Sequence, residues 1–374
     1  MKKDASLYIH IPFCVKKCNY CDFLSVAATK EQRISYLHSL CTQIKETDFN
    51  AYKPYTIFFG GGTPSLLESE ELLLIKNALE EKYMWQGAEE ITIECNPDSV
   101  TKEKLKTYRN IGVNRLSIGL QSTNSEELKI LGRVHDYETF LRAYQMAREE
   151  GFDNINVDLM SAIPKQTLSS YLEGLKQILA LNPEHISAYS LILEEGTRFY
   201  EKKEIRTMLP DEEEERQMYH KTKELLEQNG YQRYEISNYA KPGKECRHNL
   251  VYWELGEYFG LGLGASSYVK EQRYKNSENF EEYEKHPSQK IELEEVGKKQ
   301  KMEEFMFLGL RKIKGISKKE FFHLFQVPIE EIYGEIIKKY EKTGFLLCGE
   351  DRIYFSEKGL DVSNQILSEF LLSV

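Results

Sequence analysis

Three of the seven cysteines fall close together, at Cys14, Cys18 and Cys21, directly after an apolar stretch over 7–13 that is typical of a β-strand. A structural zinc site takes four ligands, and an iron–sulfur cluster that only transfers electrons is usually held by four cysteines. A [4Fe–4S] cube on three thiolates keeps one iron open for an exchangeable ligand. The spacing favours such a cluster, and the alternative is an unrelated thiol group or a zinc site completed by Cys41 or Cys95.

This spacing at the end of a first strand resembles that of the radical S-adenosylmethionine (SAM) superfamily. The resemblance implies that Cys14, Cys18 and Cys21 hold a [4Fe–4S] cluster whose open iron chelates the amino and carboxylate groups of SAM. It also implies that the reduced cluster breaks the sulfonium bond of SAM to give a 5′-deoxyadenosyl radical. In such proteins the cofactor carries the difficult chemistry and the protein positions it.

A run of glycines, Gly60 to Gly62, leads into Thr63 and Pro64. Glycines let the backbone approach a ligand closely and leave its N–H groups accessible. A tight turn between a strand and a helix is the alternative explanation for them. The resemblance implies that this segment holds the amino group of the methionine part of SAM.

The rest of the first two thirds of the chain alternates between apolar β-rich runs and stretches of helical period. Further apolar runs lie at 55–59, 90–94, 115–119, 155–158 and 185–190. Apolar residues recur every three or four positions over 31–46, 68–83, 101–110, 137–150, 168–181 and 211–228. This pattern is equally consistent with an open parallel sheet and with a barrel. The family resemblance implies an α/β fold with a partial (βα)6 TIM-like barrel.

Polar side chains stand where several of these apolar runs stop. Active sites of parallel barrels gather at the carboxyl ends of the strands, so Glu94, Gln121 and Asp158 are expected on one rim, although each alone is equally consistent with a helix cap. The resemblance to the coproporphyrinogen dehydrogenase group of radical SAM proteins implies that a larger set contacts SAM. That set is Tyr8, Tyr20, Gly61, Gly62, Thr63, Glu94, Gln121, Arg133, Asp158 and, near the adenine, Ile192.

A chain of 374 residues exceeds what one hydrophobic core usually serves. We expect a radical SAM barrel over 1–235, a connecting region over 236–296 and a smaller domain over 297–374. Helical stretches and a hairpin-like pair in the last segment are typical of a winged-helix-like α+β module, and they resemble the C-terminal domain of the same family. Acidic residues dilute its basic ones, which favours a lid or a partner-docking role over nucleic-acid binding.

Composition narrows the function classes further. The odd number of cysteines, three of them clustered, argues against a secreted disulfide framework, so we expect a reducing cytoplasm. No apolar run is long enough for a membrane-spanning helix, which leaves only a peripheral membrane contact open. The formal charge of −10 argues against general nucleic-acid binding. The acidic run 211–215 is interpreted as the first turn of a helix, where carboxylates favour the positive end of the helix dipole.

Two features separate members of this family. The oxygen-independent coproporphyrinogen III dehydrogenases carry a fourth cysteine two positions after the third, and Phe23 stands there in this chain. Only seven residues precede Tyr8, so the long N-terminal arm of those enzymes is also missing. The segment 248–253 matches instead the HNxxYW motif of the HemW family of heme chaperones.

The motif has chemistry that suits heme. Its candidate heme contacts are His248, Asn249, Tyr252 and Trp253. A neutral imidazole is a good axial ligand for heme iron, with Cys246 as the competing ligand, and Arg247 can pair with a propionate. In a helix, His248 and Tyr252 share one face. A histidine that only packs against aromatic rings is the alternative.

The sequence thus supports two hypotheses of different class. In the first, the protein is a heme chaperone that binds heme and a SAM-coordinated [4Fe–4S] cluster and passes heme to an acceptor, such as a respiratory protein. In the second, it is a coproporphyrinogen III dehydrogenase that turns two propionate side chains into vinyl groups, with loss of carbon dioxide. Phe23 and the HNxxYW match favour the first hypothesis. A radical SAM enzyme with an unrelated substrate is a third, because barrel motifs specify the cofactor better than the substrate.

Overall fold

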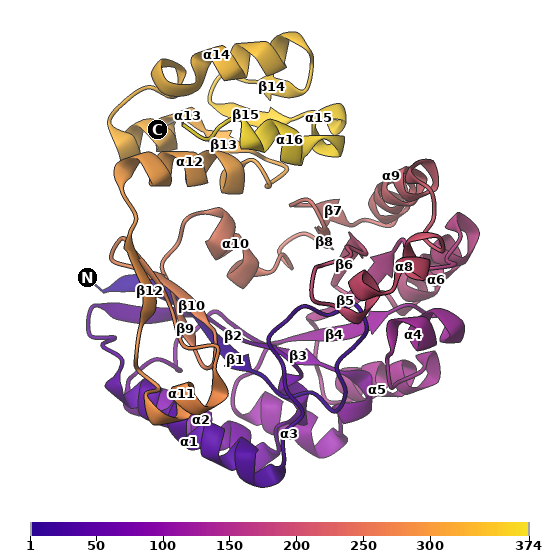
Figure 1. Ribbon diagram of the computed structural model, residues 1–374, viewed down its shortest axis with the longest axis vertical. Coiled ribbons are helices and arrows are strands. Elements are labelled where there is room, and N and C mark those ends of the chain that lie inside the picture. The colour runs from indigo at the N-terminus through magenta and orange to yellow at the C-terminus, as the bar shows by residue number, and fades with distance from the viewer. Residues whose placement is uncertain (1, 373–374) are drawn as a thin grey trace.

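The structure, a computed structural model that describes residues 2–372, is built on one curved sheet with parallel strands at its centre (Figure 1). These strands are β1 (Lys3–Ile11), β2 (Tyr52–Gly61), β3 (Glu90–Cys95), β4 (Arg115–Gln121), β5 (Ile155–Ser161) and β6 (His185–Ser190). They lie side by side in chain order, and every neighbouring pair is parallel. The predicted α/β fold with a partial (βα)6 barrel is confirmed.

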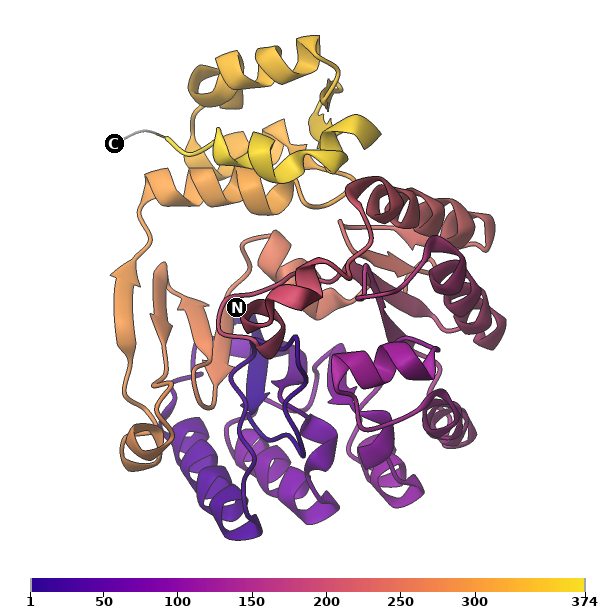
Figure 2. The ribbon, with the colours of Figure 1, turned by 45° about the vertical axis from the view of Figure 1, so that its right-hand side comes forward.

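Long helices cover the outer face of this sheet (Figures 1 and 2). They are α1 (Lys30–Glu46), α2 (Ser69–Glu81), α3 (Lys102–Asn110), α5 (Tyr137–Glu149), α6 (Leu168–Leu181) and α9 (Glu212–Gln228), each within two residues of its predicted bounds. Side-chain caps start several of them, such as Thr29 for α1 and Thr167 for α6. The side chain of Asp211 accepts a hydrogen bond from the N–H of Glu214, so the acidic run is the first turn of α9, as predicted.

Alternation along the strands separates the core from the site. On β1, Leu7, Ile9 and Ile11 are fully buried in the main hydrophobic core, while Tyr8 and His10 point to the opposite face. Burial of one such aliphatic side chain stabilises the fold by about 1.5–3 kcal/mol. The outer layer therefore fixes the strands, and the strands carry polar side chains on their inner face.

The expected connecting region forms both flanks of the sheet. It contributes β8 (Asn238–Ala240) beside β6, and β9 (Tyr258–Leu261), β10 (Ser266–Val269), β11 (Gln272–Lys275) and β12 (Ile291–Glu295) beside β1. The outermost strand next to β8 is β7 (Gln232–Arg233), which falls in the expected barrel segment. β9 is parallel to β1, and the strands beyond it are antiparallel. The connecting region also contains α10 (Arg247–Trp253) and α11 (Phe280–Lys285). These strands are too short to show a clear period in the sequence.

The C-terminal segment has its own hydrophobic core and a small sheet in the order β13-β15-β14. Its elements are α12 (Lys298–Gly309), β13 (Ile316–Ser317), α13 (Lys318–Phe325), α14 (Ile329–Lys342), β14 (Leu346–Cys348), β15 (Arg352–Phe355), α15 (Glu357–Asp361) and α16 (Ser363–Ser368). The helical stretches and the hairpin-like pair expected for this segment are present.

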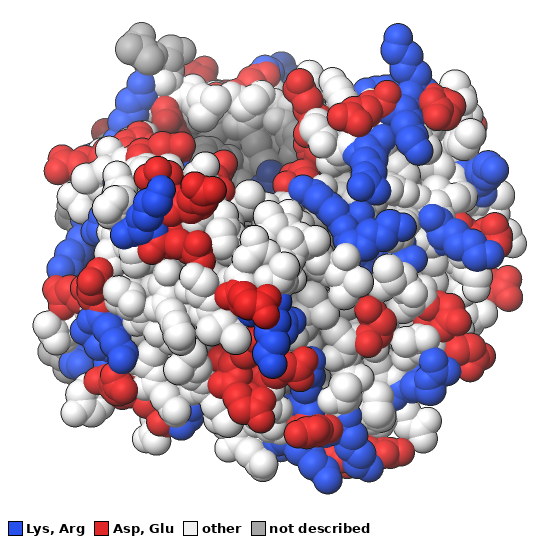
Figure 3. Space-filling model, turned by 60° about the horizontal axis from the view of Figure 1, so that its bottom comes forward, with Lys and Arg blue, Asp and Glu red and all other residues white. Residues whose placement is uncertain are grey.

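Four short helices were not predicted, namely α4 (Ser125–Leu131), α7 (Arg198–Glu201), α8 (Lys203–Arg206) and α11. Within residues 2–372, no helix is both long and apolar enough to cross a bilayer. On the face drawn in Figure 3, which looks onto the helical layer, basic and acidic side chains are interspersed.

Candidate functional site

A cleft opens at the carboxyl ends of the central strands, beside the loop 12–29 that joins β1 to α1. It has a volume of about 140 Å³. The predicted cluster and SAM residues that line it are Cys14, Cys18, Cys21, Tyr20, Gly61, Gly62, Thr63, Glu94, Gln121, Arg133 and Asp158. The fold thus brings the loop cysteines together with polar residues from β2, β3, β4 and β5.

The cysteine loop is fixed at its base and at its tip. At the base, Phe13 and Val26 form a parallel bridge, and the N–H of Cys14 donates to the carbonyl of Val26 over 3.1 Å. At the tip, the N–H of Asn19 donates to the carbonyl of Leu131, at the end of α4, over 2.9 Å. The helix that sequence reasoning missed therefore helps to hold the loop in place.

The three loop thiols are free, and none is fully buried. Arg133 donates from Nη1 to Sγ of Cys18 over 3.6 Å, and Oγ1 of Thr63 lies 3.5 Å from Sγ of Cys14. Burial raises the pKa of the Cys21 thiol to about 11. Its thiolate therefore needs a partner that offsets desolvation, and a metal centre supplies one.

Within the described residues, no three His, Cys, Asp or Glu side chains converge where a single metal ion could sit. A zinc site requires such convergence. Cys41 directs its thiol to the carbonyl of Leu74, and Cys95 directs its thiol to that of Ile93. In a [4Fe–4S] cube each cysteine binds a different iron, and Cys14, Cys18 and Cys21 all line this one cleft. These three thiols are a donor set that fits such a cluster.

The glycine run is required by close packing. Gly61 has a φ of +110°, and a Cβ there would overlap the ring of His10. A Cβ on Gly62 would lie 2.7 Å from the carbonyl oxygen of Phe13. Larger residues are excluded at both positions. This contact brings β2 against β1 and the cysteine loop, and it sets Thr63 beside Cys14.

Two buried carboxyl groups face the cleft. Burial, reinforced by nearby Asp158, raises the pKa of Glu94 to about 8. Burial also raises the pKa of Asp158, although hydrogen bonds from Asn156 and Ser187 oppose the shift. Glu94 accepts one hydrogen bond, from the N–H of Gly61 over 3.1 Å. Two neighbouring buried carboxyl groups favour a ligand with positive charge, such as an ammonium or a sulfonium group.

Arg133 and Gln121 shape the middle of the cleft. Arg133 donates from Nη2 to the carbonyl of Gly119 over 2.7 Å and to the side chain of Asn96. Gln121 has a φ of +74°, next to a break in the register between β4 and β5, and accepts a hydrogen bond from the hydroxyl of Tyr189 over 2.7 Å. Left-handed backbone at a residue other than glycine is uncommon and clusters at functional sites.

Two residues expected to contact SAM lie outside the cleft lining. Tyr8 sits behind it, where its hydroxyl contacts Nδ1 of His10 at 3.0 Å and its ring stacks on Phe58. Ile192 is 66% exposed, and its expected packing near the adenine stays a prediction. After β6 the chain leaves the sheet, and Leu191 rather than Ile192 turns into a small apolar cluster.

The polar residues that line the cleft but were not predicted include Asn96, Ser117 and Tyr189. The period of β4 places Ser117 on the same face as Gly119 and Gln121, so strand alternation could have found it. Tyr189 is a polar residue near the end of β6, the same signal that pointed to Asp158.

The HNxxYW segment forms α10, which lies between the curved sheet and the C-terminal domain (Figures 1 and 2). His248 is 1% exposed and stacks on Phe58 with ring centroids 5.0 Å apart. Its Nδ1 lies 2.7 Å from Oγ1 of Thr56, and its Nε2 lies 2.9 Å from the hydroxyl of Tyr252. Because Thr56 donates its hydroxyl hydrogen to Ser6, Nδ1 is the donor to Thr56 and Nε2 accepts from Tyr252.

In this arrangement neither candidate axial ligand, His248 or Cys246, is accessible to heme iron. Burial and the charge of Arg115 lower the pKa of His248 to about 3, so the ring is neutral, but both nitrogens are occupied. Burial raises the pKa of Cys246 to about 12, and its thiol lies 3.6 Å from Glu90. Glu90 also accepts the backbone N–H groups of Arg247 and His248, which holds the first turn of α10 to β3. The expected open histidine is therefore a buried, hydrogen-bonded one.

The other motif residues join α10 to its neighbours. Tyr252 packs edge-on against Tyr258 and lines a pocket toward α12. Trp253 lies beneath the guanidinium of Arg311, and its indole N–H has no acceptor among residues 2–372. Asn249 is half-buried. The helix is thus clamped between the sheet and the C-terminal domain.

Two parts of the chain match known protein families. Residues 8–178 match the radical SAM superfamily, and residues 296–362 match the HemN C-terminal domain. Among solved structures, coproporphyrinogen III oxidase (HemN) from Escherichia coli has the same fold, with a TM-score of 0.87 and 24% identity over 100% of this chain and 91% of that one.

Curated relatives extend over the whole chain. The heme chaperone HemW of Lactococcus lactis is 37% identical over 100% of this chain and 98% of its own length. The heme chaperone HemW of Bacillus subtilis is 36% identical over 98% of this chain and 99% of its own length. With this similarity from end to end, the chain belongs to the heme chaperone HemW family of the radical SAM superfamily.

Proposed function

We propose that the protein is a heme chaperone, which binds heme and a SAM-coordinated [4Fe–4S] cluster and transfers heme to an acceptor protein. The observation that carries this proposal is the full-length similarity to proteins named heme chaperone. The exposed Phe23 at the mouth of the cleft, where the dehydrogenases carry a cysteine, adds support. The acceptor class we expect is a respiratory heme protein.

Radical SAM proteins use a [4Fe–4S] cluster and SAM, which supply one-electron chemistry that no side chain offers. We assign the cluster to Cys14, Cys18 and Cys21. Arg133 stabilises thiolate charge at Cys18, and the glycine run keeps β2 against the cysteine loop. Glu94 and Asp158 attract the positive groups of SAM, because both carboxyl groups are buried and have few partners of their own.

We assign heme binding to α10, but only after the helix has moved away from the position described above. His248 becomes free to bind iron only when its hydrogen bonds to Thr56 and Tyr252 break. Such a movement separates the helix from β2 and from the first turn contacts with Glu90. The C-terminal domain holds the other side of α10, through Trp253 and Arg311, so a shift of that domain would release the helix.

The direct test is a heme titration followed by transfer. Stoichiometric binding of heme to the full-length protein, seen as a Soret absorbance change, is expected. Mixing the loaded protein with the heme-free form of a respiratory cytochrome should move the heme to that acceptor. A protein that does not bind heme, or that keeps it in the presence of the acceptor, contradicts the proposal.

Two variants distinguish the role of His248. His248→Ala removes the proposed iron ligand, and we expect weaker heme binding with an altered spectrum. Thr56→Val removes only the hydroxyl that holds His248 in place, so it should bind heme at least as tightly as the wild type. If His248→Ala leaves the spectrum unchanged, His248 is not the ligand. If Thr56→Val weakens heme binding as much as His248→Ala does, α10 does not have to open.

A coproporphyrinogen dehydrogenase is the second candidate. The observation in its favour is the cleft itself, since the predicted SAM residues that line it are those implied for that enzyme group. It would need no movement of α10. Formation of protoporphyrinogen over many turnovers distinguishes it from heme delivery.

A further inference from the structure

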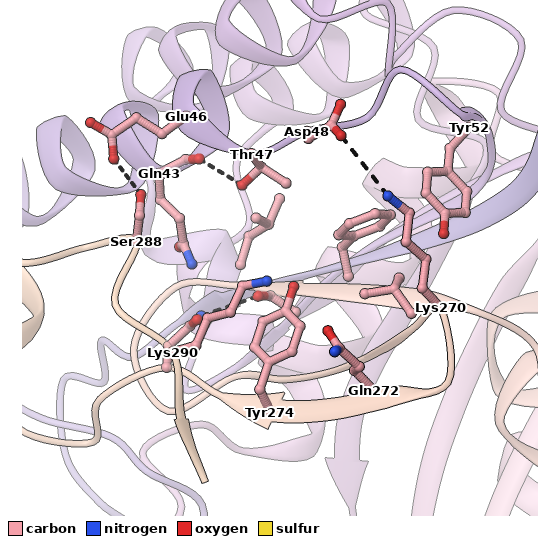
Figure 4. Close-up of a pocket in the computed structure, with 15 residues that line it drawn as sticks. Gln43, Glu46, Thr47, Asp48, Tyr52, Lys270, Gln272, Tyr274, Ser288 and Lys290 are labelled. Carbon is pink, nitrogen blue, oxygen red and sulfur yellow. Dashed lines mark hydrogen bonds and ion pairs between the residues drawn. The ribbon is translucent and has the colours of Figure 1, made fainter. Parts of the chain in front are cut away.

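A second cavity lies between the C-terminal end of α1 and the strands β9 to β11 (Figure 4). It has a volume of about 340 Å³. None of its lining residues lines the cluster cleft or belongs to α10. The cavity is therefore separate from both regions discussed above.

The inner wall of this cavity carries a buried donor without a partner. Gln43 is only 5% exposed, and its Oε1 accepts hydrogen bonds from the N–H of Gly262 and the hydroxyl of Tyr283, each over 2.8 Å. Its amide nitrogen has no hydrogen-bond partner in the described part of the chain and points into the cavity (Figure 4). Because this amide nitrogen is accessible from the cavity, it can donate to an occupant that carries acceptor oxygens.

A cation at the rim also lacks an ionic partner. Lys290 lies over the ring of Tyr274 at 4.1 Å and makes no salt bridge with any residue in 2–372. The two acidic side chains of the lining are already engaged. Glu46 accepts a hydrogen bond from the hydroxyl of Ser288, and Asp48 lies 4.0 Å from the ammonium of Lys270. Lys290 therefore supplies an exposed ammonium group at the rim that has no ionic partner among residues 2–372.

A second amide lies on the wall of the cavity beside apolar side chains. Asn276 is 1% exposed and donates from Nδ2 to the carbonyls of Gly260 and Gly262, over 3.1 Å and 2.6 Å. Its Oδ1 receives no hydrogen bond from any described residue. Phe259 and Leu261 form the apolar surface beside it.

From these groups we infer that the cavity binds a small organic anion that carries a hydroxyl group. Its carboxylate or phosphate oxygens accept from Gln43 and Lys290, and its hydroxyl donates to Oδ1 of Asn276. The carbon skeleton lies against Phe259 and Leu261. The inference does not depend on heme delivery, because it uses no residue of the cleft or of α10.

The test is isothermal titration calorimetry of the full-length protein with three probes, namely lactate, glycerol 3-phosphate and inorganic phosphate. We expect saturable binding at one site for lactate or for glycerol 3-phosphate, and the stronger of the two identifies the anionic group. Lys290→Met should weaken that binding at least tenfold. Lys285→Met, which removes a lysine of α11 outside the cavity, should leave it unchanged.

Gln43→Leu removes the inner donor but also two accepted hydrogen bonds, so the inference is judged on Lys290→Met, which breaks no hydrogen bond of the fold. The inference is overturned if neither organic anion binds the wild type. It is overturned equally if Lys290→Met binds like the wild type, or if Lys285→Met has the same effect as Lys290→Met.

Discussion

The cluster cleft and α10 are the two regions that sequence motifs singled out, and their polar groups are arranged in opposite ways. In the cleft, free thiols and carboxyl groups face open space, and Glu94 has one hydrogen-bond donor. On α10, His248 has both ring nitrogens occupied and is almost fully buried. The first region is built to receive a ligand as it stands, whereas the second has to move before it can bind one.

The difference follows from where each motif lies in the fold. The cysteine and glycine motifs sit on a loop and a strand end, where a fixed backbone displays functional groups. The HNxxYW motif lies on a helix in which His248 is buried in the way that a core residue is. The imidazole of His248 is already neutral, as an iron ligand must be. We therefore expect that movement of α10 is the main step needed to expose this imidazole to heme. The comparison predicts that changes in one region leave the other working.

Loss of any loop cysteine should have the largest effect. Replacing Cys14, Cys18 or Cys21 with Ala removes a proposed ligand, and we expect complete loss of the cluster absorbance after anaerobic reconstitution. Heme binding should remain in part, because α10 shares no residue with the loop. Equal loss of cluster and heme binding would show that the two regions form one site.

Glu94→Gln should weaken SAM binding strongly. A hydrogen bond to a charged group contributes about 1.5–3 kcal/mol, so we expect a roughly ten- to hundredfold rise in the dissociation constant of the reconstituted protein. Glu90→Gln is the matched control, since Glu90 lies on the same strand but holds α10. The account fails here if both variants bind SAM alike.

The stability of cluster-free protein should fall as pH rises from 5 to 8. The pKa of Glu94 is about 8 in the folded protein, above its ordinary value of 4.5, so the folded state keeps a proton that the unfolded state has lost. The expected slope is at most about 1.4 kcal/mol per pH unit. Urea unfolding at several pH values measures it, and Glu94→Gln should flatten the curve. Parallel curves for the two proteins would show that Glu94 does not titrate in this way.

Tyr252→Phe should have the smallest effect. It removes the hydroxyl that donates to His248, and we expect a loss of about 1 kcal/mol in the free energy of unfolding. The cluster absorbance should not change. A variant with unaltered stability but a disturbed cluster would contradict the proposed independence of the two regions.

The fold was largely predictable because its strands and helices have clear periods. Glu94 and Asp158 were found because each is a polar residue at the point where an apolar run stops. The position of Ile192 was harder to predict because it lies beyond a strand, where the direction of the chain depends on tertiary contacts such as those of Leu191. The short strands β7 to β12 carry too few residues for any period to appear.

For α10, the local sequence predicts the helical face but does not predict the contacts that distant segments make with it. The spacing of His248 and Tyr252 predicted a shared helical face, and the structure confirms it with a hydrogen bond. No local pattern could reveal that two residues of the distant strand β2 contact the imidazole, Thr56 through a hydrogen bond to Nδ1 and Phe58 by stacking on the ring. The residue type predicts that His248 can bind iron, but whether its ring nitrogens are free to do so depends on the packed fold.

The most direct measurement is an anaerobic assay of cluster-reconstituted protein with SAM, a reductant and coproporphyrinogen III, run beside a heme titration on the same preparation. The account predicts stoichiometric heme binding and no protoporphyrinogen. Protoporphyrinogen formed over many turnovers, without stoichiometric heme binding, would contradict heme delivery and identify the cleft as that of a coproporphyrinogen dehydrogenase.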